Sequence, residues 1–304
     1  MVSIVTKKIG NNEYLYLVSS IREGTKVKQK TIKYIGKKRP IHNLEFECMK
    51  RSYEKKDWVL GFKDQLSYQD HDLMRKSSEN YKSYLKKFDI ISKEKERERF
   101  LALFIANSNS IEGSTLTVKD TFNYLFDDIV PSGYSKKELH MASNLLLAWE
   151  YVENNCNHLP LKKDLLELHR LVNKDIEDIN TLGKFKQIQN YVGEGYTTSF
   201  LFVEERIEDL LHWIKEAFKK VDDFEVVFQS HVQFEIIHPF VDGNGRVGRL
   251  LLNWLLMYKG LMGFAIPVSK RNKYLSAIHK AENGSLKEIC IFCFEEYVSY
   301  YKFL

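Results

Sequence analysis

Twelve residues, His238 to Arg249, constrain this 304-residue chain more than any other stretch; they read His-Pro-Phe-Val-Asp-Gly-Asn-Gly-Arg-Val-Gly-Arg. The apolar run that follows to Lys259 predicts a helix, and Gly260 is placed to end it. The glycines of the stretch therefore lie at a helix N-terminus, where free N–H groups and the helix dipole favour an anion. The pattern predicts a phosphate-binding loop.

The glycines and arginines of this stretch suit a polyphosphate. Gly243 and Gly245 remove the side chains that would keep an anion away from the backbone. Arg246 and Arg249 are three positions apart, so both can reach the same side of the first helical turn. Two cations at a helix N-terminus disfavour the free helix, and a bound anion relieves that repulsion.

The remaining polar residues indicate chemistry as well as binding. Asp242 is a hard oxygen ligand suited to Mg²⁺, and His238 can act as a general base near neutral pH. A plain turn needs neither group. A calcium loop also begins Asp-x-Asn, but Arg246 occupies a ligand position, Val247 replaces the required glycine, and Asn253 stands where a bidentate glutamate is needed. We therefore expect a nucleoside triphosphate as the ligand.

These residues resemble the signature of the Fic family, H-P-F-x-D-G-N-G-R-x-x-R, and match it at every specified position. The resemblance implies transfer of AMP from ATP to a Ser, Thr or Tyr hydroxyl of a target protein, with His238 as the base and Asp242 as the Mg²⁺ ligand. It implies that Arg249 grips the γ-phosphate. Retention of Gly245 favours AMP transfer over the other transfers that some relatives perform. The implied phosphate site consists of Gly243, Asn244, Gly245, Arg246 and Arg249.

A second motif lies upstream. Residues 100–113 form a helical pattern that ends at Gly113 and leaves Glu112 in the last turn, where the helix dipole disfavours a carboxylate by about 0.3–1 kcal/mol if it is exposed. Ser108-x-x-x-Glu112-Gly113 resembles the inhibitory motif of the same family, [S/T]-x-x-x-E-[G/N]. The resemblance implies that Glu112 pairs with Arg249 and blocks productive placement of ATP. It leaves open a second role, in which Glu112 positions a water that removes AMP.

Residues 183–203 predict a β-hairpin around a Gly-Glu-Gly turn. The hairpin falls where the Fic family carries its flap, which holds the target segment by strand addition. A plain surface hairpin is the alternative. The family often has arginine where this chain has lysine at 184. The resemblance assigns target binding to Lys184, Ile188, Tyr191 and Val192.

The N-terminal residues 1–42 predict a small basic module of three strands. They hold ten Lys or Arg and two Glu, a net charge of +8, while the rest of the chain is near −3. Alternating lysines at 26, 28 and 30 project from one strand face. They indicate either a solvated edge or a nucleic-acid footprint; we expect the former, because no aromatic stacking pattern is evident among them. The pattern loosely resembles the start of some archaeal Fic-like proteins and some transposases. The expected strands are Val2–Ile9, Tyr14–Ile21 and Lys26–Ile35.

The expected fold is mainly α, a Fic-type helical bundle with a β-hairpin flap behind the small β-rich module. We expect the module at 1–42, a helical connector at 43–92, and the Fic catalytic domain with its inhibitory helix at 93–304. Ser92 is the expected N-cap of the inhibitory helix, and Thr117 with Asp120 resembles a capping box. Further helices are expected at 136–153, 161–176, 204–220, 223–237, 272–282 and 286–301.

Composition sets the remaining expectations. Cys290 and Cys293 lack a second pair and lie in an apolar helical run, which favours core packing over a metal site. The histidines show no close-spaced metal cluster; His169 and His212 are expected on helix faces. No signal peptide or convincing membrane span is evident, so we expect a cytoplasmic enzyme that uses ATP and Mg²⁺. The resemblance also implies homodimers. A nucleic-acid-binding regulator, acting through residues 1–42, is the rival hypothesis.

Overall fold

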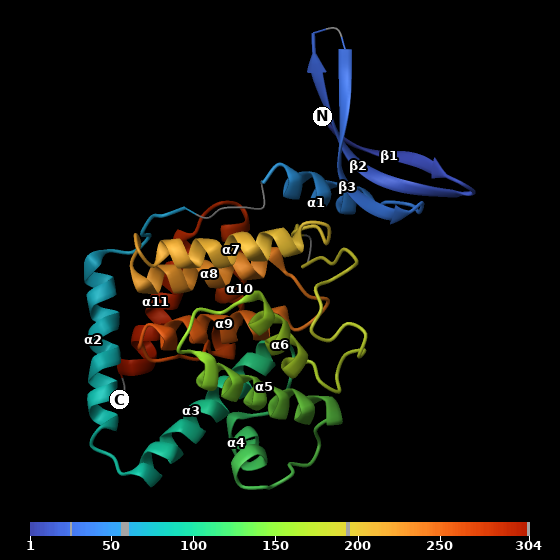
Figure 1. The fold of residues 1–304 in the computed structure, drawn as a ribbon. Helices are drawn as coiled ribbons and strands as arrows, with labels where there is room; N and C mark the ends of the chain where they lie inside the picture. The colour runs from blue at the N-terminus through green and yellow to red at the C-terminus, as the bar shows by residue number, and fades with distance from the viewer. Residues whose placement is uncertain (25, 56–60, 193–194, 303–304) are drawn as a thin grey trace.

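The computed structural model describes residues 1–24, 26–55, 61–192 and 195–302. A small antiparallel sheet precedes a bundle of helices (Figure 1), which confirms the expected mainly helical fold with its N-terminal β module. The elements are β1 (Val2–Ile9), β2 (Asn12–Glu23), β3 (Lys26–Lys37), α1 (Asn43–Tyr53), α2 (Tyr68–Leu85), α3 (Ile90–Ile111), α4 (Val118–Phe126), α5 (Lys136–Asn155), α6 (Lys162–Val172), α7 (Val203–Ala217), α8 (Asp223–Ile237), α9 (Asn244–Tyr258), η1 (Val268–Lys270), α10 (Arg271–Glu282) and α11 (Lys287–Lys302).

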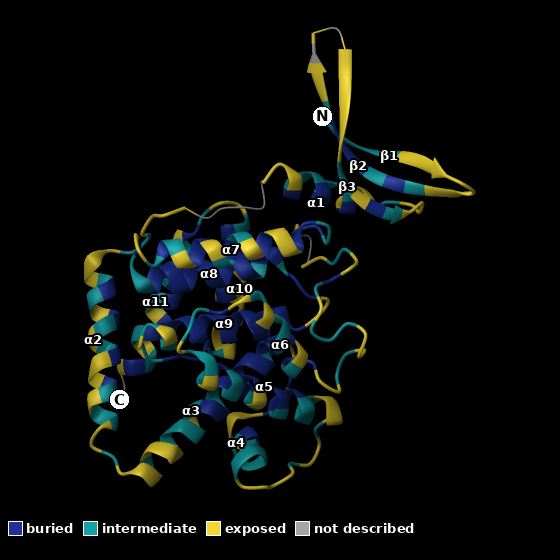
Figure 2. Ribbon diagram, viewed as in Figure 1, coloured by how far each residue is buried: buried dark blue, intermediate teal, exposed yellow. Residues whose placement is uncertain are grey.

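Helices α8 and α9 form the centre of the bundle. Most residues of both are buried (Figure 2), polar ones such as Glu225, His231 and Arg246 included. Helices α7, α10 and α11 pack on α8, while α3, α5 and α6 pack on α9. Fully buried side chains such as Phe228, Phe234 and Trp254 each contribute about 1.5–3 kcal/mol through burial. The predicted phosphate loop joins the two central helices and is therefore anchored at both ends in the buried centre of the bundle.

Helix boundaries follow the predicted caps with two corrections. Helix α3 begins at Ile90, because Asp89 rather than Ser92 is its N-cap: the Asp89 carboxylate accepts from Ser92 N–H at 2.7 Å. Helix α6 ends at Val172, four residues early, because the chain turns at Asn173. Thr117 caps α4 as predicted, accepting from the N–H of residue 120 at 3.1 Å.

The predicted strands form a sheet in the order β1-β2-β3. Leu15, Leu17 and Ile35 pack against Met49 of α1 and against Phe202, just before α7. Two register shifts in the β2–β3 pairing leave one extra β3 residue each time. The β module is therefore attached to the bundle by its own small apolar core.

Two further expectations concern the apolar segments. The four cysteines are free thiols, and Cys290 and Cys293 are buried on α11, consistent with core packing. Within the described residues, no helix combines the length and apolar character that crossing a membrane requires.

Candidate active site

The loop between α8 and α9 carries the predicted phosphate-binding residues. His238 ends α8 in the left-handed conformation (φ 50°), and Pro239 cannot continue a helix. The Asn244 side chain then closes the loop, because its Oδ1 accepts from Phe240 N–H at 2.8 Å and its Nδ2 donates to Phe240 O at 2.9 Å. The imidazole and the first turn of α9 are thereby fixed relative to each other. Since the Asn244 side chain faces the loop interior, only its backbone N–H is left to face a ligand.

The His238 imidazole is prepared to accept a proton. Its Nδ1 lies 3.3 Å from the carbonyl oxygen of Glu235, which can only accept, so Nδ1 carries the proton and Nε2 keeps its lone pair. Burial, and then the positive charge of Lys186, lower the pKa of His238 to about 4. The imidazole is therefore neutral at physiological pH, as a general base must be.

Glycines bring other side chains against the first turn of α9. Gly243 has φ +76°, and a Cβ there would lie 2.6 Å from Asn173 Nδ2. A Cβ on Gly245 would collide with Oε1 of Glu112 and lie 2.9 Å from Nη1 of Arg249. The Glu112 carboxylate thus occupies the space over the helix N-terminus, which is where the sequence predicts an anion.

Arg246 lies beneath this turn as a buried cation, only 2% exposed. Its Nη2 donates to Asn173 Oδ1 at 2.9 Å and lies 3.8 Å from Oδ2 of Asp242, and its Nη1 donates to Val172 O at 3.4 Å. Burial lowers the pKa of its guanidinium. Its Nε has no hydrogen-bond partner among the described residues. A buried and incompletely paired cation favours a bound anion.

Arg249 is directed toward α3. Its Nε donates to Ser108 Oγ at 2.8 Å, and its Nη2 donates to Ser108 O at 2.9 Å and to Glu112 Oε1 at 2.7 Å. Burial opposes the charge of this guanidinium, but the Glu112 carboxylate raises its pKa. Gly113 (φ +99°) ends the helix directly behind. Ser108 and Glu112 of the predicted inhibitory motif therefore contact the second arginine, 141 and 137 positions away in sequence.

A cleft of about 380 Å³ opens beside these groups. The Asp242 side chain is 60% exposed at its edge, and its Oδ1 accepts from Gly243 N–H at 2.6 Å. A carboxylate that faces an open cleft fits Mg²⁺, which takes one or two carboxylates and completes its octahedron with phosphate oxygens and waters. The lining residues are Glu112, Gly113, Ser114, Thr115, Ser135, Lys137, Glu138, Met141, Asp242 and Arg246.

Residues 159–256, which include α8, this loop and most of α9, match the Fic/DOC family. The chain contains a Fic domain. It is 31% identical over 192 residues to protein adenylyltransferase fic-1 of Caenorhabditis elegans and 33% identical over 190 residues to protein adenylyltransferase Fic of Drosophila virilis. These alignments cover 61% and 60% of this chain but only 37% and 38% of the relatives. The chain thus spans well under half the length of these curated relatives.

Solved structures show the same fold. A fragment of Fic-1 from C. elegans superposes with a TM-score of 0.65 at 24% identity, covering 77% of this chain and 71% of that one. A Fic-domain signalling protein from Bacteroides thetaiotaomicron gives 0.68 at 22% identity, covering 76% and 95%. Outside the Fic domain, residues 2–56 match the N-terminal domain of IS1634 family transposases. The β module and α1 therefore resemble a different family from the bundle.

His169 of α6 and Asn173, the residue after its end, lie against the candidate site although no motif in the sequence selected them. His169 was expected on a helix face, but it is fully buried and its ring stacks 4.0 Å from that of Phe240. Its Nδ1 accepts from Gly183 N–H at 3.0 Å, and burial lowers its pKa to about 4. Asn173, four residues on, donates to Asp242 O at 3.2 Å and accepts from Arg246. The i, i+4 spacing of His169 and Asn173 was the only sequence signal.

A buried polar cluster lies beneath Arg249. His231 Nε2 lies 2.7 Å from the Tyr274 hydroxyl, and its Nδ1 lies 3.9 Å from Oε1 of Glu235. Burial raises the pKa of Glu235 to about 8 and lowers that of His231 to about 3, so both are neutral at physiological pH. A Cβ on Gly248 would collide with Oε1 of Glu235. This glycine therefore makes room for the glutamate in the core of the Fic domain.

The predicted β-hairpin flap is not formed as two paired strands. Within the described residues, the segment shows a single isolated bridge, between Val192 and Gly195, and residues 193–194 of the predicted turn lie outside them. The arms bond to the end of α8 and its loop instead. Lys186 N–H donates to Pro239 O at 2.9 Å, and Thr198 N–H donates to Ile236 O at 3.4 Å. Tertiary hydrogen bonds have taken the place of the strand ladder that the local pattern predicts.

The four predicted target-binding residues line the outer side of this flap segment, where all are exposed: Lys184, Ile188, Tyr191 and Val192. The buried base of the segment is Lys186, which the sequence reasoning missed. Its Nζ donates to Asn190 Oδ1 at 2.6 Å and to Thr197 Oγ1 at 3.1 Å, and burial lowers its pKa to about 7.

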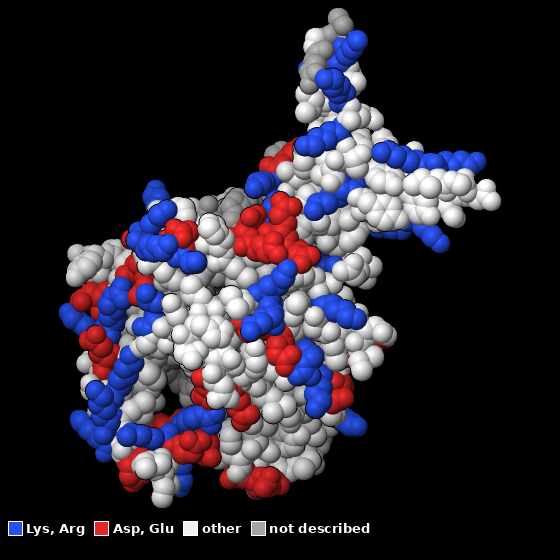
Figure 3. Space-filling view, viewed as in Figure 1, with Lys and Arg blue, Asp and Glu red and all other residues white. Residues whose placement is uncertain are grey.

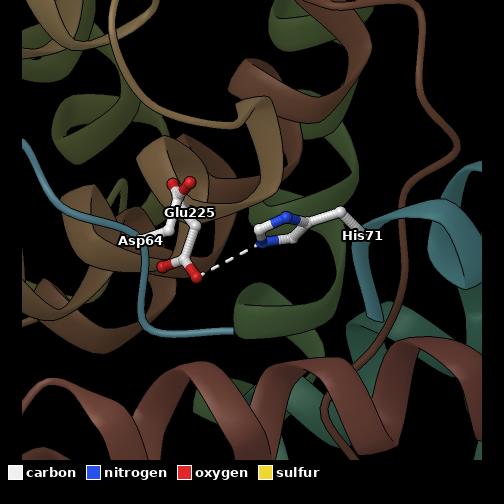
Figure 4. Close-up of side chains that lie close together, drawn as sticks. All are labelled: Asp64, His71 and Glu225. Carbon is white, nitrogen blue, oxygen red and sulfur yellow. Dashed lines mark hydrogen bonds and ion pairs between the residues drawn. The ribbon is translucent and has the colours of Figure 1, made fainter. Parts of the chain in front are cut away.

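Asp64, His71 and Glu225 meet near the opposite end of α8 (Figure 4), where the sequence predicted no cluster. The buried Glu225 carboxylate accepts from the N–H groups of Gln65 and Leu66 at 2.7 and 2.6 Å, and lies 3.3 Å from His71 Nε2. All three of these groups contact Oε1, and Gln229 Nε2 donates to Oε2 at 2.9 Å, so the carboxylate fastens the segment before α2 to the bundle. We interpret the cluster as a structural clamp.

Proposed function

We propose that this chain is a protein adenylyltransferase that moves AMP from MgATP to a Ser, Thr or Tyr hydroxyl. One observation carries the proposal: His238 Nε2, the exposed carboxylate of Asp242 and the buried, underpaired Arg246 are fixed around one helix N-terminus beside a cleft. A base, a cation ligand and an anion site in this arrangement suit attack on a phosphorus atom. The names of the curated relatives support the same reaction class.

In the proposed step, His238 Nε2 takes the proton of the target hydroxyl. The hydroxyl oxygen forms a bond to the α-phosphorus, and the bond from that phosphorus to the bridging oxygen of the β-phosphate breaks, releasing pyrophosphate. The N–H groups of the first turn of α9 and the Arg246 guanidinium offset the charge that builds on the phosphates. Asp242 would hold Mg²⁺, which when bound neutralises part of the triphosphate charge. Most of the rate enhancement comes from positioning and charge stabilisation.

Glu112 would act as the inhibitor of this reaction. Its carboxylate lies over Gly245 and accepts from Arg249, so an incoming γ-phosphate would have to take both places. Two anions cannot occupy one site without strong repulsion. Nucleotide would then bind productively only when Glu112 moves away, and removal of this carboxylate would release the enzyme.

The target would bind along the outer side of residues 183–203. Ile188 and Tyr191 line a groove of about 320 Å³, and Ile35 and Arg39 of the N-terminal part face them across it. Ile188 is 64% exposed and Tyr191 40% exposed. Residues 187–191 of this segment belong to no strand, so their backbone could pair with an extended target peptide by strand addition.

Labelled ATP tests the reaction class. In the Glu112→Gly variant, which lacks the inhibitory carboxylate, ATP labelled at the α-phosphate should label protein, and ATP labelled at the γ-phosphate should not. Adding His238→Ala should abolish transfer while ATP binding persists. Glu153→Gln is a matched control, because it breaks the α3–α5 ion pair to Arg97 (2.5 Å) without touching the site. Transfer of the γ-label, or full activity without His238, would contradict the proposal.

Removal of AMP is the second candidate. Glu112 keeps 36% of its side chain exposed at the edge of the cleft, where it could orient a water toward a modified target. Protein pre-labelled with AMP would then lose its label faster with the wild type than with Glu112→Gln. If both release label at the same rate, Glu112 acts as an inhibitor alone.

A further inference from the structure

The β module carries a surface that the proposed transfer does not use. Residues 1–42 have a net charge of +8, while the remainder of the chain is near −3. Figure 3 shows Lys and Arg side chains along the sheet and its projecting arm. Glu13, one of the two acidic residues of this region, is itself paired with Lys38 at 2.9 Å. The module is therefore a positive appendage on a slightly negative body.

Strand register gathers three tyrosines on one face of the sheet. Leu15 and Leu17 face α1, so the alternating residues Tyr14 and Tyr16 lie on the opposite face. The Tyr34 ring lies 6.0 Å from that of Tyr14 and 5.3 Å from that of Tyr16. Tyr34 keeps 52% of its surface exposed. The aromatic pattern that the linear sequence did not reveal is thus assembled by strand pairing.

Lysines flank these rings on both neighbouring strands. Lys7 of β1 and Lys37 of β3 each stand directly opposite Tyr14, so both lie on the tyrosine face. Lys7 Nζ lies 4.6 Å from the centre of the Tyr16 ring and donates to Thr31 Oγ1 at 3.3 Å. Aromatic faces bordered by cations are the combination that binds bases and phosphates together.

The β2–β3 arm extends the positive surface. Past Ser20 the two strands run beyond the rest of the sheet (Figure 1), and Ile21 and Val27 on them remain 53% and 64% exposed. A two-stranded ribbon without a packed face gains little stability by itself. Its cations are well placed for a partner of opposite charge. The exposed basic residues of the arm are Arg22, Lys26, Lys28 and Lys30.

We propose that the tyrosine face of the sheet binds single-stranded nucleic acid. Bases stack on Tyr14, Tyr16 and Tyr34, and phosphates follow Lys7, Lys37 and the arm. Stacking on aromatic rings tolerates any base, so binding depends little on sequence, and phosphate contacts make it sensitive to salt. This function is independent of adenylyl transfer, and it would hold the enzyme beside proteins on the same strand.

A purely structural role predicts a different outcome. Cross-strand tyrosine pairs stabilise sheets, and lysines on an edge discourage aggregation. Neither role makes oligonucleotide binding depend on the aromatic ring of Tyr34 or on the charges beside it. The test therefore distinguishes the effect of the Tyr34 ring from that of its hydroxyl. It also distinguishes charges beside the tyrosines from charges elsewhere on the chain.

The experiment uses the full chain and fluorescence anisotropy. Probes are labelled oligothymidylate and oligouridylate of about 16 nucleotides, the upper site size of a small β domain, and a duplex of the same length. We expect both single strands to bind, with affinity falling about 20-fold between about 50 and 200 mM salt if three phosphates are contacted. Tyr34→Leu should weaken binding about fivefold or more, whereas Tyr34→Phe should keep it.

Charge variants complete the test. Lys7→Gln/Lys37→Gln should weaken binding and lower the salt slope by about 0.7 per lysine, the single-strand value. Lys86→Gln/Lys87→Gln, which removes two exposed charges at the far end of α2, should leave both unchanged. Three results would each overturn the proposal. The first is no binding of either single strand, and the second is an equal loss in the two charge variants. The third is a preference for the duplex that Tyr34→Leu does not change.

Discussion

The loop between α8 and α9 and the tyrosine face of the β module both gather cations, but in opposite surroundings. Arg246 and Arg249 are 2% exposed, and named neighbours fix each of them. Lys7 and Lys37 beside the tyrosines are exposed. The Lys7 ammonium contacts two uncharged groups, the Thr31 hydroxyl and the Tyr16 ring. A buried cation is expensive unless its partners are in place, while an exposed one costs little. The arginines of the loop are therefore held in one arrangement, whereas the exposed lysines of the sheet can adjust to the partner that they bind.

The largest expected effect comes from removing one cation from each region and comparing the rates of AMP transfer. In a Glu112→Gly background, Arg246→Gln should lower kcat/KM for AMP transfer about 100- to 1000-fold, because a donor is lost where transition-state charge develops. Lys26→Gln should leave transfer unchanged. Steady-state rates with α-labelled ATP measure both. Equal losses in the two variants would mean that burial does not distinguish these cations.

The second effect concerns pH and the cluster beneath Arg249. Because burial raises the pKa of Glu235 from 4.5 to about 8, the folded state holds a proton that the unfolded chain has released within this window. The contribution of Glu235 to stability should therefore fall as pH rises through the window, by at most about 1.4 kcal/mol per pH unit. Urea unfolding should show this slope as the difference between the wild type and Glu235→Gln. The neighbouring His231, whose pKa burial lowers from 6.5 to about 3, contributes with the opposite sign below pH 6.5, and that contribution is common to both proteins. If the free energy of unfolding of Glu235→Gln had the same pH slope as that of the wild type, groups other than Glu235 would cause the pH dependence.

The next effect sharpens the claim that the central helices are closely packed. Gly248→Ala should destabilise the fold by about 1–3 kcal/mol, because the new methyl meets Glu235 and lies 3.2 Å from Phe234. Gly61→Ala is the matched control, since nothing lies within 4 Å of its Cβ position. Chemical denaturation compares the two. If Gly248→Ala were as stable as the control, the core would have room that the structure does not show.

The smallest effect belongs to the arm. Lys26→Gln/Lys30→Gln should change the free energy of unfolding by no more than about 0.5 kcal/mol, since both side chains are exposed. Thermal unfolding provides the measurement, with Lys86→Gln/Lys87→Gln alongside. A loss above 1 kcal/mol, taken as about twice that bound, would show that the arm depends on its lysines for folding.

The sequence predicted the features that depend on neighbouring residues, and it failed for features that depend on contacts between residues far apart in the chain. His238 to Arg249 could be placed because helix termini dictate where such residues lie. The pairing of Glu112 with Arg249, far apart in sequence, came only from a family resemblance. His169 and Lys186 were missed, because a single polar residue in an apolar pattern gives no sign of its partners. The flap prediction was wrong as to its strands, since backbone donors there bond to the end of α8 and its loop.

The tyrosine face illustrates the same limit in the β module. All three strands were predicted, but the two register shifts were not. Counted from the pair of Glu23 and Lys26, the shift between Leu17 and Val18 brings Tyr34 opposite Tyr16 in place of Lys33, on the side away from α1. A bulge changes which face a residue occupies, and period-two alternation alone cannot show it.

The central claim is that the Glu112 carboxylate holds the place of the γ-phosphate on Arg249. The most direct measurement compares initial rates of label transfer from α-labelled MgATP by the wild type and by Glu112→Gly, with the same target extract. A coupling of ordinary size between the two anions predicts a rate about 5- to 150-fold higher in Glu112→Gly. Equal rates, in samples that bind ATP equally, would contradict the claim.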